Sequence, residues 1–100
     1  MNLRLQLASV IKAVRKRQGR SQEDFSLVSS RTYLSSLERG LKSPTIDKLV
    51  EIAGVLNVHP ASLVILAECA NLTSNSGIDQ IDQIANEAKS LVSLCLNEVG

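Results

Sequence analysis

The chain has 100 residues, of which 44% are hydrophobic, 2% aromatic and 21% charged, and its net charge is +1. This length supports one compact core and is too short for two ordinary domains. The near absence of aromatic side chains excludes a surface that binds single-stranded nucleic acid by stacking the bases.

Several other classes of protein are also excluded. No apolar stretch is long enough to span a membrane, and the N-terminus has no signal-peptide pattern, so we expect a cytoplasmic protein with no membrane partner. The single histidine, His59, and two distant cysteines, Cys69 and Cys95, do not form a metal-ligand pattern. We therefore expect no metal and no cofactor, and we expect both cysteines to be buried inside apolar helices.

Charge is distributed unevenly along the chain. Residues 1–42 carry nine Lys and Arg against three Asp and Glu, a net +6. Residues 43–100 carry two Lys against seven Asp and Glu, a net −5. A basic N-terminal half is typical of a protein that binds a polyanion. The alternative is a solvated basic surface without a ligand.

Helical periodicity and capping residues predict two helices at the start of the chain. Apolar residues at steps of three and four predict an amphipathic helix over residues 3–17, which Gly19 ends. Ser21, followed by Gln-Glu-Asp, is an N-cap signature. It predicts a second helix that passes through Phe25 and ends at about Val28.

Three further helices are predicted before the linker. A short one lies between the capping residues 29–32 and Gly40, and another covers residues 46–56 after the turn at 43–45. The next begins at Pro60, since proline suits the first position of a helix. No segment alternates with a period of two, so we expect an all-α fold.

The C-terminal part of the chain is predicted to be a polar linker at 71–77 and one long helix at 78–99. This division leaves residues 1–70 as one domain. The helix is too apolar to remain in water alone, so it packs either on its own domain or on a second copy of the chain. Its apolar positions recur at alternating steps of three and four: Ile78, Ile81, Ala85, Ala88, Val92, Cys95 and Val99.

A series of short motifs in residues 7–66 resembles the Cro and phage-repressor-like helix-turn-helix proteins, the Xre family. The motifs are Val14-Arg15, Ser21-Gln22-Glu23-Asp24-Phe25, Arg31-Thr32-Tyr33-Leu34-Ser35, Leu37-Glu38-Arg39-Gly40, Ser43-Pro44-Thr45 and Leu49-Val50-Glu51-Ile52-Ala53. The resemblance implies a repressor-like domain of five helices, followed here by the additional amphipathic helix. It also implies that the third helix lies in the major groove of double-stranded DNA.

The resemblance also implies roles for individual residues. The base-reading residues would be Arg31, Thr32, Ser36 and, as a weaker candidate, Ser35. The phosphate contacts would be Gln22, Tyr33, Arg39 and Lys42, and Arg17 suits nonspecific attraction of phosphate. Arg31 would be the principal reader because its guanidinium can pair with two acceptors of guanine. Glu38 would form a salt bridge with Arg15 rather than contact DNA.

Each of these roles has a structural alternative. Arg31 could be a solvated residue at the start of a helix, Tyr33 a packing residue at the edge of the core, and Gln22 a capping partner. His59 is best interpreted as an N-cap.

The sequence departs from the family pattern at one place. The separation of Phe25 and Tyr33 is eight positions, where the family has about ten. Either the second helix is shortened or the third begins almost without a turn.

The functional hypothesis is a homodimeric transcriptional regulator, a repressor by resemblance, that binds a palindromic operator. One short helix reads only a few base pairs, so useful specificity needs two half-sites. The expected dimer interface is the 78–99 helix; its alternative is a sixth helix folded back on the same domain. The alternative function is an antitoxin or interaction module that binds a partner protein through this helix. An enzyme is not expected, since no catalytic set of side chains is evident.

Overall fold

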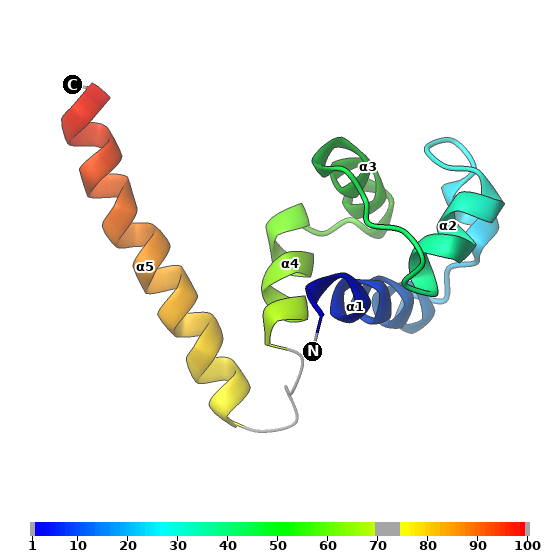
Figure 1. Cartoon of the computed structure of the whole chain (residues 1–100), viewed down its shortest axis with the longest axis horizontal. Coiled ribbons are helices and arrows are strands. Elements are labelled where there is room, and N and C mark those ends of the chain that lie inside the picture. Colours follow the sequence, from blue (N-terminus) through cyan, green and yellow to red (C-terminus); the bar gives the residue numbers. More distant parts are fainter. Residues whose placement is uncertain (1, 70–74, 100) are drawn as a thin grey trace. The chain divides into compact units, whose positions relative to one another are not determined.

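The computed structural model describes residues 2–69 and 75–99 (Figure 1). These residues are all-helical, as predicted, and contain no strand. The elements are α1 (Leu3–Arg17), the 3₁₀ helix η1 (Gln22–Phe25), α2 (Arg31–Glu38), α3 (Ile46–Leu56), α4 (Pro60–Glu68) and α5 (Asn75–Val99). The chain divides into two units, Met1–Glu68 and Cys69–Gly100, which are described separately.

Polar side chains cap the helices of the first unit. The Asn2 side chain accepts a hydrogen bond from the Arg4 N–H at 2.7 Å at the start of α1. Thr45 accepts one from the Lys48 N–H at 3.1 Å at the start of α3. His59 Nδ1 accepts one from the Ala61 N–H at 3.0 Å, which confirms that His59 is an N-cap. Such caps satisfy backbone donors that have no partner within the helix.

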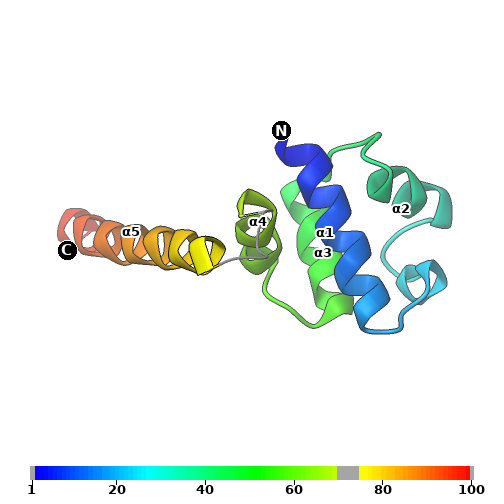
Figure 2. The ribbon, with the colours of Figure 1, turned by 90° about the horizontal axis from the view of Figure 1, so that it is seen from below.

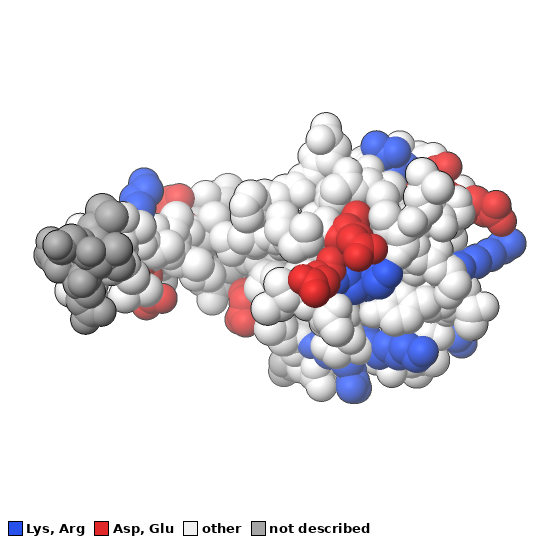
Figure 3. Space-filling view, turned by 90° about the horizontal axis from the view of Figure 1, so that it is seen from above, with Lys and Arg blue, Asp and Glu red and all other residues white. Residues whose placement is uncertain are grey.

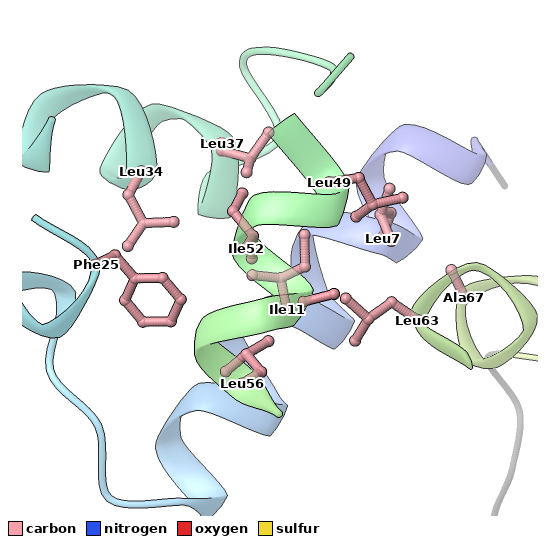
Figure 4. Close-up of a cluster of buried hydrophobic side chains, with 11 residues drawn as sticks. Leu7, Ile11, Phe25, Leu34, Leu37, Leu49, Ile52, Leu56, Leu63 and Ala67 are labelled. Atoms are coloured by element: carbon pink, nitrogen blue, oxygen red, sulfur yellow. The ribbon is translucent and has the colours of Figure 1, made fainter. Parts of the chain in front are cut away.

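The core of the first unit lies between its helices (Figure 4). Figure 2 shows α1 and α3 between α4 on one side and η1 with α2 on the other. Every element contributes apolar side chains that are at most 2% exposed: Ile11, Phe25, Leu34, Leu37, Ile52, Leu56 and Leu63. Apart from Phe25 the core is therefore aliphatic, and it fixes the position of α2 relative to α1 and α3.

The second helix is much shorter than predicted. Its helical residues are Gln22–Phe25, a single 3₁₀ turn, instead of a helix that reaches Val28. Of the two alternatives for the short spacing between Phe25 and Tyr33, the structure therefore has the shortened helix. The Ser30 hydroxyl accepts the Tyr33 N–H at 3.0 Å and so starts α2 at Arg31.

The second unit contains α5, a helix of 25 residues. Residues 71–74 of the predicted linker lie outside the described residues, and 75–77 are helical, so the helix begins three residues earlier than predicted. Cys69 is buried, as predicted, but Cys95 is exposed. Burial of Cys95 within its own chain was therefore a wrong expectation.

No single helix among the described residues is both long enough and apolar enough to cross a membrane. Helices α3 and α4 satisfy that test only together, and they are bent by 101° relative to each other.

Candidate nucleic-acid interface

An open hollow of about 330 Å³ lies on the exposed side of η1 and α2. Its lining residues are Gln22, Arg31, Thr32, Ser35 and Arg39. Three of them belong to α2 and Arg39 directly follows it, and these four fall at positions that share one side of a helix. Arg31, Thr32 and Arg39 are exposed and Ser35 is half-buried. All four can donate hydrogen bonds, so this side of α2 suits a ligand rich in acceptors.

Arg31 begins α2 and extends into solvent. Its side chain is 74% exposed, and its Nη1 lies 3.4 Å from Oε1 of Glu23, whose side chain is 71% exposed. An ion pair this exposed contributes little stability. The guanidinium is thus free to exchange this carboxylate for another acceptor.

Ser36, also expected to read bases, does not line this hollow. Its exposed fraction is 9%, and its chain neighbour Leu37 is part of the core. Consecutive residues of an α-helix point in directions about 100° apart. Ser35 therefore faces the hollow, whereas Ser36 faces the interior.

Gln22 is held at the edge of the hollow by a carboxylate of α2. Its Nε2 donates to Oε1 of Glu38 at 3.1 Å. The N-terminus of η1 is a weak site for phosphate, because η1 has only four residues. The Asp24 carboxylate also occupies this end, where it accepts the Ser21 N–H at 2.7 Å. The Gln22 side chain, rather than a helix end, is thus what η1 offers to a phosphate.

The Arg15 guanidinium binds both carboxylate oxygens of Glu38, which confirms the salt bridge predicted between them. Arg15 Nε donates to Oε2 at 2.7 Å and Nη2 donates to Oε1 at 2.9 Å. Arg15 also donates to the carbonyl of Arg20 at 2.9 Å. The hydrogen bond to Glu38 raises the pKa of the Arg15 guanidinium, although burial opposes it. Glu38 thus ties α2 to α1 and is not available to a ligand.

Two ammonium groups lie close to the ring of Tyr33. Lys42 Nζ is 5.5 Å from the centre of its ring and Lys48 Nζ is 5.7 Å from it. Cations at these distances are attracted to the face of an aromatic ring. Tyr33 is half-buried and packs against the core, so the alternative of a packing residue at the core edge describes part of its role.

Lys48 is a structural residue that the sequence did not reveal. Its Nζ donates to the carbonyl of Val28 and contacts Glu51 at 3.3 Å. It thereby connects α3 to the short segment that precedes α2. Only the spacing of Lys48 and Glu51 within one helix is visible in the sequence, and the contact with Val28 depends on the fold.

The remaining basic residues assigned to phosphate are on the surface. Arg17 at the end of α1, Arg39 at the end of α2 and Lys42 after it are all exposed. Figure 3 shows one face of the molecule, on which most of the basic surface belongs to the unit formed by α1 to α4. This distribution agrees with the net +6 of residues 1–42.

Comparison with known proteins decides the family. A family model described as helix-turn-helix matches residues 11–63, which is more than half of the chain. The chain belongs to the helix-turn-helix family. In this helix-turn-helix protein, the matched span contains η1 and α2. The family is that of the Xre-like and Cro-like helix-turn-helix proteins.

A relative and two solved structures agree with this assignment. The relative, an uncharacterized HTH-type transcriptional regulator, y4dJ, from Sinorhizobium fredii (strain NBRC 101917 / NGR234), is 39% identical over 66 residues. This match covers 64% of the chain and 86% of the relative.

The two solved structures are crystal structures of the clp gene regulator ClgR from Corynebacterium glutamicum. One has a TM-score of 0.65 at 25% identity, covering 74% of this chain and 99% of that one. The other has a TM-score of 0.64 at 24% identity, covers 92% of this chain and 90% of that one, and shows the likeness of fold alone.

The protein is a DNA-binding helix-turn-helix transcriptional regulator. The names of its family and relative describe regulators rather than enzymes.

Proposed function

We propose that the protein is a cytoplasmic, sequence-specific regulator that binds a palindromic operator as a homodimer. The observation that carries this proposal is the exposed side of α2, where Arg31 and Thr32 stand free of the core. A helix with donors on its outer side fits the major groove, whose base edges are rich in acceptors.

Within this proposal, Arg31, Thr32 and Ser35 read base edges. Arg31 pairs with O6 and N7 of a guanine, a contact worth about 1–3 kcal/mol of discrimination against other bases. Thr32 and Ser35 have short side chains, so they contact only bases that lie directly against α2. The buried Ser36 takes no part.

The phosphate contacts belong to residues around this reading surface. Tyr33, Arg39 and Lys42 flank it on and after α2, Gln22 borders it on η1, and Arg17 lies at the end of α1. Contacts with phosphate set orientation and supply affinity that does not depend on sequence. Lys42, beside the Tyr33 ring, attracts the same phosphates that the Tyr33 hydroxyl can reach.

The dimer forms through α5. Its residues Ile78 and Val92 are 58% and 53% exposed, an apolar surface that a second copy would cover. Two copies place two reading helices on one duplex, which matches the symmetry of a palindrome. A partner protein on α5, as in an antitoxin, remains the alternative occupant, and the mass of the purified complex distinguishes the two.

The test is the binding of the full chain to duplexes selected from a random pool, measured by fluorescence anisotropy over a series of salt concentrations. We expect one sequence with an inverted repeat to be enriched, and its affinity to fall steeply as salt rises. Single strands of the same sequence are the control and should bind far more weakly. Binding that is independent of salt, or no preference between duplex and single strand, would contradict the proposal.

A further inference from the structure

Helix α5 carries an apolar seam with unlike borders. The seam consists of positions spaced three and four apart, the spacing at which two helices pack along their length: Ile78, Ile81, Ala85, Ala88, Val92 and Cys95. Each of these side chains is exposed or half-buried in the single chain. The seam is therefore available to a second helix over residues 78–95.

The two borders of the seam differ in chemistry. One border consists of Ile84 and Leu91, which directly precede the seam residues Ala85 and Val92. Within residues 78–95 the other consists of Asp82 and Lys89, which directly follow Ile81 and Ala88, and Leu96 follows Cys95 at its end. Lys89 is the only cationic residue in the sequence of α5, whereas acidic residues occur along its whole length.

These borders distinguish the two ways in which a pair of helices can align. In a parallel pair, unlike borders meet: a residue that precedes a seam position in one helix faces a residue that follows a seam position in the other helix. Ile84 would then face Lys89 of the second copy and Asp82 would face no cation, so only Leu91, opposite Leu96, would have a matching partner. In an antiparallel pair, like borders meet, so apolar residues face apolar ones and charged residues face charged ones.

We propose that α5 pairs with α5 of a second copy in the antiparallel direction. Ile81 lies opposite Val92 of the second copy and Ile78 lies opposite its Cys95. This register brings Asp82 beside Lys89 of the second copy, and the two-fold axis repeats the ion pair. It also joins Ile84 to Leu91 of the second copy on the other border.

Small residues at the centre are compatible with this register. Ala85 lies opposite Ala88 of the second copy, so the two backbones can approach closely. The larger Ile84 and Leu91 then cover the alanines from the side and exclude water from them. The proposal rests on the homodimer proposed above and specifies its direction and register.

The exposed Cys95 tests the direction. A parallel pair places the two Cys95 residues in one layer, within reach of a disulfide. The antiparallel register separates them by about 26 Å along the helix axis. We therefore expect the parent dimer to resist cross-linking by mild oxidation or a short bismaleimide, and I78C to cross-link readily through residue 78 and Cys95. The double variant I78C/C95S should lose the cross-link, whereas a parallel pair would retain it.

Charge reversal tests the register. Asp82→Lys and Lys89→Asp each place two like-charged pairs at the border, and we expect each to weaken dimerisation about tenfold in analytical ultracentrifugation. An equal mixture of the two variants restores both ion pairs and should dimerise nearly as well as the parent. The matched control, Asp79→Lys, makes the same change on the side away from the seam and should have little effect.

The outcomes separate the two proposals. A dimer that cross-links through two Cys95 residues, or a mixture of charge variants that does not recover, overturns the antiparallel register while the homodimer stands. A parent chain that is monomeric at all concentrations overturns both.

Discussion

Arg15 and Glu38 form a two-pronged ion pair that is almost fully buried, with side-chain exposures of 10% and 2%. The residues are 23 positions apart, so the pair connects α1 to α2. The pKa of Arg15 is raised on folding. The ion pair therefore contributes its full stability at any pH below the ordinary pKa of arginine. This contribution is lost only in strongly alkaline solution. The pair therefore holds α2 in place throughout the neutral range.

Glu38→Gln should destabilise the protein by about 3 kcal/mol, because it leaves the buried guanidinium of Arg15 without a counter-charge. Urea unfolding followed by circular dichroism measures the change. The control is the double variant Arg15→Met/Glu38→Met, which removes both charges and should be more stable than Glu38→Gln. A double variant that is less stable than the single one would contradict the burial argument.

Lys48→Met should lower the free energy of unfolding by about 1–2 kcal/mol, since it removes a charged donor from the Val28 carbonyl. The matched control is Lys12→Met, which removes the same charge from an exposed position on α1. Comparison of the two in urea separates the loss of the contact from the loss of charge. Equal effects would mean that Lys48 does not hold the segment before α2.

Gly40→Ala should destabilise the protein by about 1–2 kcal/mol. Gly40 has φ +74°, and an added Cβ would overlap Leu5 Cδ2. Gly54 is the matched control because it lies within α3 with nothing near its Cβ position. Gly54→Ala should stabilise the protein by about 0.5–1 kcal/mol. Thermal unfolding that shifts in the same direction for both variants would disagree with this account.

Arg31→Ala should relax the preference for one base pair of the operator and leave binding to random duplex nearly unchanged. Lys42→Ala should weaken binding to all duplexes alike and reduce the salt slope by about one. Anisotropy titrations against the operator and its single-base variants measure both effects. If both variants bind operator and random DNA like the parent, α2 is not the reading helix.

Val92→Glu should prevent dimerisation, because it places a charge in the middle of the apolar seam of α5. Ser93→Glu adds the same charge one position away and should leave the dimer intact. Sedimentation of both variants, together with their circular dichroism, reports association and folding separately. A dimeric Val92→Glu chain with unchanged operator affinity would remove α5 from the interface.

Much of the first unit could be predicted from local signals. The apolar spacing of α1 predicts its observed bounds, Leu3–Arg17, and Pro60 marks the start of α4. These elements are predictable because their caps and apolar stripes lie within the element itself. The early end of η1 was missed, because the serines that follow Phe25 satisfy backbone groups equally well outside a helix.

The candidate site was predicted less completely, because it depends on contacts between distant segments. Ser36 and Ser35 are equivalent in composition, and only the direction of α2 relative to the core separates them. Lys48 reaches Val28, which is 20 positions away. Gln22 was expected to face phosphate, and its bond to Glu38 appears only once η1 and α2 are brought together.

The contact between Arg31 and Glu23 has a consequence for selectivity. In the free protein the Glu23 carboxylate lies beside Nη1 of Arg31, a donor that would otherwise bind a guanine. On the proposed function, docking on any operator replaces this acceptor with another. Because an ion pair this exposed contributes little stability, its release costs little and costs the same at every site, so the preference at this base pair depends on what each base offers Arg31.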